Sequence, residues 1–288
     1  MQMKKILVPI DLNDLCYETL SMAVGYALQF EGRLLLLNVL DTNSGRVNSQ
    51  HTEMESLADY HSRRWRYAQV EIEKLSQRLL FEFGIQTDSL CGEGDPAKVI
   101  IDVASEERCD FVLMLTHGRT GLAHMLVGSV GEQVVRNSPC PVLTLVRPYD
   151  YSLEGIAPFI PEIHRILVPC ELNDISYNAI DAAATFANGC HAQIDVLHVL
   201  GFADSEMQAD QLLRQKLLPS LEDGIPANFD IRHGFAFNEI LKKSEVDEPD
   251  LIVMGTEGRT GWRQALHPSL AERIVRSAHC PVLTVHAS

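Results

Sequence analysis

The sequence has no apolar run of about 18 residues or more, which is the length that a membrane-spanning helix needs. Its opening segment, MQMKKILVPI, also lacks the long apolar stretch of a secretory signal peptide. With 46% hydrophobic and 22% charged residues, the composition is that of a globular protein. We therefore expect a soluble, cytoplasmic protein with no membrane span.

Positive charge is scarce as well. Lys and Arg number 24 against 39 Asp and Glu, which gives a formal net charge of −15. Such a balance argues against nucleic acid and anionic membranes as general partners. The seven cysteines form no CxxC pattern, and the eleven histidines have no metal-ligand spacing. We expect no metal site, and we expect Cys140 and Cys280, which lie beside apolar strands, to be reduced core residues.

Common catalytic signatures are absent too. The chain contains no HExxH, GxSxG or GxxxxGK[ST] motif, so it has no standard hydrolase or kinase machinery. No residue is assigned a catalytic role, and we expect a weak ATPase activity at most.

What the sequence does contain is one long segment that occurs twice. Met114–Val146 aligns without a gap onto Met254–His286, displaced by 140 positions, and about half of the aligned residues are identical. The segment Lys5–Leu20 similarly matches Arg165–Ile180, displaced by 160. The chain is therefore a duplicated domain. The difference of 20 between the two offsets must be extra length in the first copy, between its second and third strands.

The elements expected in each copy alternate between short apolar strands and amphipathic helices. The first copy's strands are Ile6–Ile10, Leu34–Leu40, Thr87–Cys91, Phe111–Leu115 and Val142–Val146. The second copy's are Ile166–Cys170, Gln193–Leu200, Asn228–His233, Leu251–Gly255 and Val282–Val285. This order predicts two tandem α/β domains, each a doubly wound five-stranded parallel sheet. We place the domains at residues 1–147 and 162–288, with a linker at 148–161.

The extra length in the first copy has two parts. Asp41–Ser56 is polar and without an apolar period, which predicts a loop. Leu57–Phe83 predicts one long helix, with Trp65 and Ala68 among its apolar positions.

A candidate anion site lies where Gly128 and Ser129 begin the helix of the repeated segment. A helix start offers unpaired N–H groups and the positive end of the helix dipole, which suit a phosphate. Asp11 follows the first strand, and the carboxyl ends of parallel strands share one edge, so Asp11 and this loop can converge. The alternative is that Ser129 and Glu132 form a capping box that starts the helix without a ligand.

These features together resemble the universal stress protein family. The resemblance rests on a strand ending in VP-D, a G-D-P turn, a DxVxM strand, a G-x2-G-x9-G-[ST] loop and a CPVL strand, in that order. It covers essentially the whole chain. It implies a fold related to adenine-nucleotide α-hydrolase-like domains, a stress-linked cytoplasmic role and self-association through last strands. Some members bind ATP and keep the glycine signature, whereas others have lost it.

Carried onto the first copy, the resemblance assigns Asp11 to the base and ribose region and Gly118, Gly128 and Ser129 to the phosphates. Arg119, in the repeated GRTG, is a further phosphate candidate. Leu115 stands where the signature's first glycine belongs, and a bulky side chain there can shift or close the site.

The second copy departs differently. Gly255 and Gly258 match the first two glycines, but Pro268 replaces the third and removes an N–H donor. Glu171 replaces the aspartate. We expect this copy to bind no phosphate, while Ser269 and Glu272 form a capping box.

Three functions remain open. The first is a stress-response protein whose N-terminal domain binds ATP, with Mg²⁺. The second is a nucleotide-free scaffold or a carrier of lipids or other small ligands that acts through protein partners, and the third is a slow ATPase.

Association follows from the last strands, which would be exposed apolar edges if each domain stood alone. Pairing them, through Val142 and Val146 with Val282 and Val285, makes an intramolecular pseudo-dimer, and two chains can associate further as a homodimer.

Overall fold

The chain forms two compact units in the computed structural model, which describes residues 3–12, 17–42, 57–115, 128–145, 155–159, 162–201, 205–217, 221, 224–256 and 268–286. The N-terminal unit comprises Met3–Leu113 and Asp150–Ile160, and the C-terminal unit comprises Met114–Tyr149 and Pro161–Ser288. These units follow packing, whereas the domain boundaries predicted above follow the sequence repeat.

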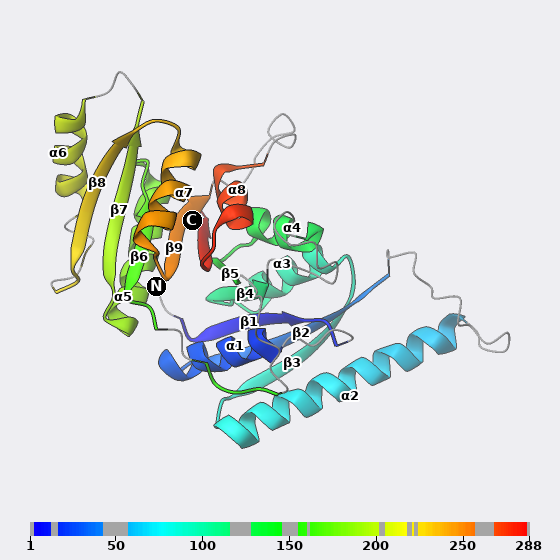
Figure 1. Ribbon diagram of the computed structural model, residues 1–288. Helices are drawn as coiled ribbons and strands as arrows, with labels where there is room; N and C mark the ends of the chain where they lie inside the picture. The colour runs from blue at the N-terminus through cyan, green and yellow to red at the C-terminus, as the bar shows by residue number, and fades with distance from the viewer. Residues whose placement is uncertain are drawn as a thin grey trace. The chain divides into compact units, whose positions relative to one another are not determined.

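The N-terminal unit is built on parallel strands in the order β3-β2-β1-β4 (Figure 1). Their bounds are β1 Lys5–Ile10, β2 Arg33–Asp41, β3 Thr87–Gly94 and β4 Phe111–Leu115. The apolar runs of β1, β2 and β4 are buried because such strands are covered on both faces. The core of this unit therefore lies along strands that the sequence predicts.

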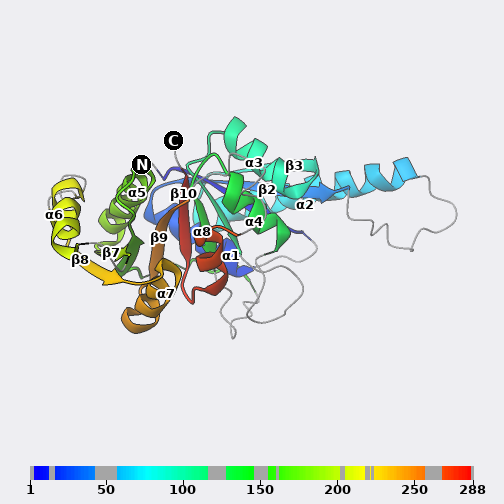
Figure 2. The same cartoon turned by 90° about the horizontal axis from the view of Figure 1, so that it is seen from above.

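Three helices accompany these strands: α1 Tyr17–Gln29, α2 Leu57–Phe83 and α3 Pro96–Glu106. The bounds predicted for α2 are confirmed. Its buried residues begin at Ala68, and Figure 2 shows the preceding turns extending past the strands of the unit. Asp95 caps α3 by accepting a hydrogen bond from the Lys98 N–H at 3.0 Å, directly before Pro96.

The C-terminal unit contains five parallel strands in the order β8-β7-β6-β9-β10. Their bounds are β6 Arg165–Pro169, β7 Gln193–Leu200, β8 Ala227–His233, β9 Leu251–Thr256 and β10 Val282–His286. The helices between them are α5 Asp174–Cys190, α6 Glu206–Leu217, α7 Ala236–Asp247 and α8 Leu270–Ser277. The order of strands reverses between β6 and β9, so the second repeat is the doubly wound sheet that its sequence predicts.

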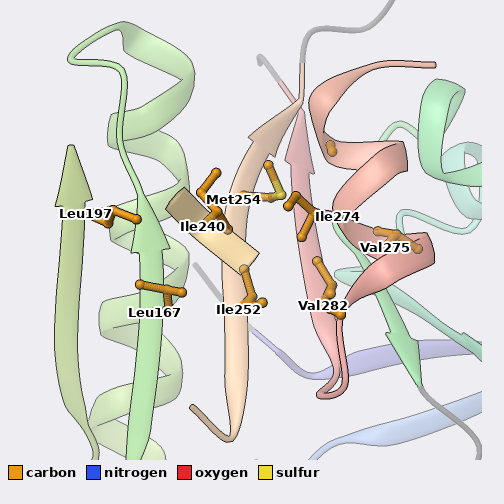
Figure 3. Close-up of a cluster of buried hydrophobic side chains, with 10 residues drawn as sticks. Leu167, Leu197, Ile240, Ile252, Met254, Ile274, Val275 and Val282 are labelled. Atoms are coloured by element: carbon orange, nitrogen blue, oxygen red, sulfur yellow. The ribbon is translucent and has the colours of Figure 1, made fainter. Parts of the chain in front are cut away.

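A continuous apolar cluster holds α7 and α8 against this sheet (Figure 3). Leu167, Ile252 and Val282 from three strands pack with Ile240 of α7 and Ile274 of α8, and all five are almost fully buried. Each aliphatic side chain of this kind contributes about 1.5–3 kcal/mol when it is fully buried. Of the two cysteines expected in the core, Cys140 is buried and Cys280 is partly buried, and both are free thiols. Burial raises the pKa of Cys280 to about 12, which keeps it a thiol at neutral pH.

The C-terminal unit also contains the last elements of the first repeat, α4 Ser129–Asn137 and β5 Val142–Leu145. β5 pairs antiparallel with β10, with Leu143 opposite Leu283. The Thr144 hydroxyl donates to the Val282 carbonyl at 2.9 Å, and the Thr284 hydroxyl donates to the Val142 carbonyl at 3.3 Å. The predicted pairing of the two last strands is therefore present. Val142, Val282 and Val285 are buried, and Val146 lies outside the described residues.

Two ion pairs between equivalent residues join α4 and α8. The Arg136 guanidinium donates to both carboxylate oxygens of Glu272, each at 2.9 Å, and Arg276 pairs with Glu132. Glu272 is only 2% exposed, so its charge depends on the Arg136 partner. The two glutamates occupy equivalent positions in the repeat, and so do the two arginines.

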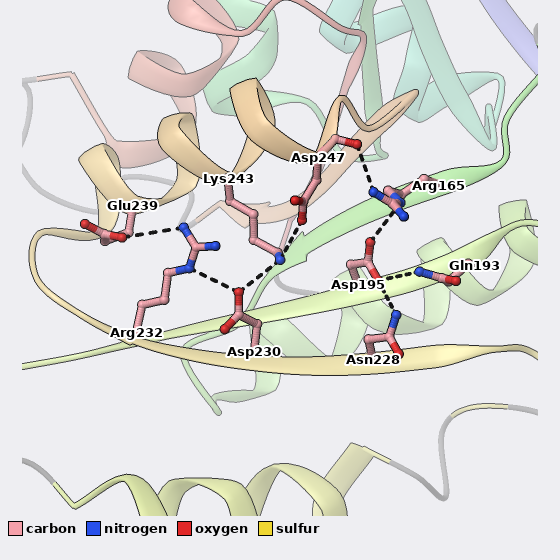
Figure 4. Close-up of polar contacts among 9 residues, drawn as sticks. All are labelled: Arg165, Gln193, Asp195, Asn228, Asp230, Arg232, Glu239, Lys243 and Asp247. Carbon is pink, nitrogen blue, oxygen red and sulfur yellow. Dashed lines mark hydrogen bonds and ion pairs between the residues drawn. The ribbon is translucent and has the colours of Figure 1, made fainter.

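A charged network lies between α7 and its sheet in the C-terminal unit (Figure 4). Lys243, 7% exposed, contacts Asp230 at 3.0 Å and Asp247 at 2.7 Å, and Arg165 contacts Asp195 at 3.2 Å. Burial would raise the pKa of Asp230, but Lys243 and Arg232 lower it overall. The first repeat has Leu35, Leu90 and Val103 in place of Asp195, Asp230 and Lys243. The two copies therefore differ at these three positions, which are charged in the second repeat and apolar in the first.

Among the described helices, none is both long and apolar enough to cross a membrane.

Replacing Arg136 with Met should destabilise the fold by about 3–5 kcal/mol, because it leaves the Glu272 carboxylate buried without a cation. Urea denaturation followed by circular dichroism measures this loss. The double variant Arg136→Met/Glu272→Leu should recover most of it. Arg78→Met, which breaks an exposed pair with Glu82, should cost about 0.5 kcal/mol or less. Equal effects of the Arg136 and Arg78 substitutions would contradict the buried role of the pair.

Candidate functional site

In the loop after β6, at the carboxyl edge of the sheet, the polar groups form hydrogen bonds with one another. Asn173 caps α5, and its Oδ1 accepts hydrogen bonds from the N–H and the hydroxyl of Ser176, each at 2.9 Å. The Ser176 hydroxyl in turn accepts from the Glu171 N–H at 2.9 Å, and the Asn173 amide donates to the Glu171 carboxylate at 3.3 Å. These groups form a closed network that needs no ligand.

Gly255, at the end of β9, explains how α5 can begin so close to the sheet. A Cβ at this position would lie 2.4 Å from Cγ2 of Ile175 and 3.0 Å from its carbonyl oxygen. The signature's first glycine therefore makes room for the start of a helix in this copy. Leu115 occupies the equivalent position in the first copy.

The start of α8 carries the capping that its sequence predicts. Ser269 is the cap residue, and its hydroxyl accepts a hydrogen bond from the Glu272 N–H at 3.2 Å. Pro268 precedes it and has no N–H to donate. Because one donor is missing and another is occupied, this helix start is a poor anion site.

The equivalent helix α4 begins differently, and the alternative interpretation of Ser129 and Glu132 as a capping box is wrong. The cap residue is Gly128, and Ser129 is already the first helical residue. Glycine has no side chain that could accept the first N–H groups, and Glu132 pairs with Arg276. Gly128 has φ −58°, and a Cβ there would meet no atom of the described residues within 4 Å. The described residues therefore leave space at the start of α4.

The other predicted residues of the first copy divide into two groups. Asp11 is exposed directly after β1, at the carboxyl edge of the N-terminal unit's sheet. Gly118 and Arg119 lie outside the described residues. The convergence of Asp11 with the glycine loop stays a prediction.

One further polar position belongs to no motif, although both copies of the repeat have a polar residue there. Asn38 of β2 and His198 of β7 are related by the offset of 160. The Asn38 amide donates to the Ile10 carbonyl at 2.9 Å, and Nδ1 of His198 contacts the Cys170 carbonyl at 2.7 Å. Asn38 is 3% exposed, and its Oδ1 receives no hydrogen bond within the part of the chain that the structure describes. It is a buried acceptor beside the end of β1.

The described residues include no group of three or more His, Cys, Asp or Glu side chains that could hold a metal ion.

Comparison with known proteins identifies a family with this architecture. The model of the universal stress protein family matches residues 3–146 and again residues 162–286. A universal stress protein of Methanocaldococcus jannaschii is 29% identical over 145 residues, which are 50% of this chain and 83% of that protein. One from Bacillus subtilis is 28% identical over 143 residues, 48% of this chain and 96% of that protein.

Solved structures agree on the fold. The crystal structure of a universal stress protein from Archaeoglobus fulgidus covers 100% of both chains with a TM-score of 0.76 at 20% identity. A putative universal stress protein from Pseudomonas aeruginosa covers 99% of this chain and 93% of its own, with a TM-score of 0.66 at 19% identity. The chain belongs to the universal stress protein family, as two tandem copies of its domain.

The two signature glycines should respond differently to alanine. Gly255→Ala should lower the free energy of unfolding by about 1–3 kcal/mol, because the new methyl group overlaps Ile175. Gly128→Ala is the matched control and should cost under about 1 kcal/mol, since its Cβ meets open space. Equal losses in urea denaturation would show that Gly255 is not needed for the approach of α5.

Proposed function

We propose that the N-terminal copy binds an adenine nucleotide, ATP with Mg²⁺, and that the C-terminal copy has lost this ability and serves the fold. The observation that carries the proposal is the contrast between the two equivalent helix starts. α4 begins at a glycine that no atom of the described residues crowds, whereas α8 begins behind a proline and is capped by Ser269. An uncapped helix start suits a phosphate because its N–H groups point at the ligand.

Polar groups also lie at the carboxyl edge of the N-terminal unit's own sheet. Asp11 is exposed after β1, and the buried Oδ1 of Asn38 accepts no hydrogen bond from the described residues. A carboxylate suits the hydroxyls of a ribose, and an amide oxygen suits the exocyclic amine of adenine. These groups support a nucleoside recognised at the carboxyl end of β1 and β2.

In this proposal the protein is a cytoplasmic, stress-responsive binding protein that reports on nucleotide rather than consuming it. Slow ATP hydrolysis is less favoured, because no group of carboxylates among the described residues could hold a catalytic metal. The competing function is a nucleotide-free scaffold or a carrier of lipids or small ligands. The closed network of Glu171, Asn173 and Ser176 favours it for the second copy, and Leu115 favours it for the first.

Isothermal titration with ATP and Mg²⁺ should give one site per chain, and Gly128→Pro should weaken it at least about tenfold by removing one N–H donor. The φ of −58° and the open space suit proline, so this variant should fold normally. Asp11→Ala should also weaken binding. The reverse change in the second copy, Pro268→Gly, leaves Ser269 as the cap and should add no second site.

No heat with the wild-type chain would remove the nucleotide function and leave the scaffold. Binding that Gly128→Pro leaves unchanged would place the nucleotide elsewhere. ATP turnover equal in the wild type and in Gly128→Pro would exclude an ATPase at this site.

We also propose that the β5–β10 pairing makes the chain an intramolecular pseudo-dimer of its two copies. Residues 162–288 expressed alone would expose the β10 edge, which is apolar, so they should self-associate. Sedimentation velocity should show a species larger than the monomer. A monodisperse monomer would contradict the proposal.

A further inference from the structure

The first turns of α2 form a surface that has no counterpart in the second copy. α2 has 27 residues, whereas the equivalent helix α6 has 12. Between Tyr60 and Val70 the helix carries three arginines, one histidine and no carboxylate. In a chain of net charge −15 this is a local reversal of sign, and an anion is the ligand that it favours.

A hollow of about 480 Å³ that is open to solvent lies beside these turns, and we call it the cavity below. It is lined by Leu40 and Glu93 at the ends of β2 and β3 and by His61, Ser62, Trp65 and Arg66 of α2. Leu40 and Glu93 are neighbours in the sheet register, so the floor of the cavity is fixed by strand pairing. None of these residues belongs to the proposed nucleotide site.

The arginines of this helix divide by their contacts. Arg63 and Arg64 stand over the ring of Tyr60, at 5.9 and 5.7 Å from its centroid. Arg66 instead lines the cavity, and its Nε donates to the Ser62 carbonyl at 3.3 Å. That bond orients the guanidinium through one nitrogen and leaves its terminal nitrogens able to hold a carboxylate or phosphate in a two-point contact.

We propose that this cavity binds a small planar aromatic anion. The indole of Trp65 and the side chain of Leu40 offer apolar surface to a ring, Arg66 and His61 face its anionic group, and Glu93 accepts a hydrogen bond from a ring hydroxyl or amine. The helical wall comes from the extension of the first copy, so the site belongs to that copy alone. It shares no residue with the proposed nucleotide site.

The probe is 4-hydroxybenzoate, titrated calorimetrically into the full chain, with 4-hydroxybenzamide as the uncharged match. The acid should bind, and the amide should bind at least about tenfold more weakly because it lacks the charge that Arg66 recognises. Arg66→Gln should cause a similar loss. Arg63→Gln removes an equal charge from the same helix without touching the cavity and should change the affinity by less than about twofold.

A second readout uses tryptophan fluorescence. The chain has two tryptophans, so Trp262→Phe leaves Trp65 as the sole indole, and its emission should be quenched by 4-hydroxybenzoate. Both readouts should persist in Gly128→Pro, which separates this site from the nucleotide site.

Three results would overturn the proposal. They are the absence of heat and quenching with the acid, equal affinity for acid and amide, or equal losses in Arg66→Gln and Arg63→Gln. The last would mean a diffuse basic surface rather than a site.

Discussion

The antiparallel pairing of β5 with β10 is the constraint on which the C-terminal unit depends. Each copy ends in a short apolar strand whose outer edge would attract other chains if it stayed unpaired. Pairing the two strands satisfies the backbone hydrogen-bonding groups of both edges, and Thr144 and Thr284 add side-chain hydrogen bonds between them. We call β5, β10, α4 and α8 together the seam. The ion pairs Arg136–Glu272 and Arg276–Glu132 also favour this strand register, because a slip of one residue in the strands would separate them.

This arrangement accounts for how far the two copies have diverged elsewhere. Both copies supply one strand and one helix to the seam, and there their residues are the same: CPVLT, an arginine and a glutamate. Elsewhere, Asp230 and Lys243 beneath α7 are charged where the first copy has Leu90 and Val103, and the loop before α5 satisfies its own hydrogen bonds. A duplicated fold can lose a ligand in one copy without losing its structure, because the helix starts are capped by protein groups instead.

Much of this fold could be predicted from the sequence. Short apolar strands alternating with helices imply parallel sheets, and the internal repeat implies that two last strands need partners. The helix bounds Leu57–Phe83 followed from the apolar period, although only the part from Ala68 onward is buried. The pattern of Ser269 followed by Glu272 predicts a cap, and Ser269 is one, because its hydroxyl accepts a hydrogen bond from the Glu272 N–H.

Other features depended on contacts between distant segments. Ser129 has the same local sequence signal as Ser269, but its helix begins one residue earlier, so the cap is Gly128. Nothing near Glu132 or Glu272 in the sequence points to an arginine of the other copy. The role of Asn38 is visible only once Ile10 lies beside it in the register of β1 and β2. The cavity along α2 likewise needs β2 and β3 to bring Leu40 and Glu93 together.

Hydrogen–deuterium exchange with and without saturating ATP and Mg²⁺ tests the central claim, that one copy responds to nucleotide and the other does not. Backbone amides at the start of α4 and at the ends of β1 and β2 should gain protection, while those at the start of α8 and after β6 should not change. Equal protection in both copies, or none in either, would contradict the account.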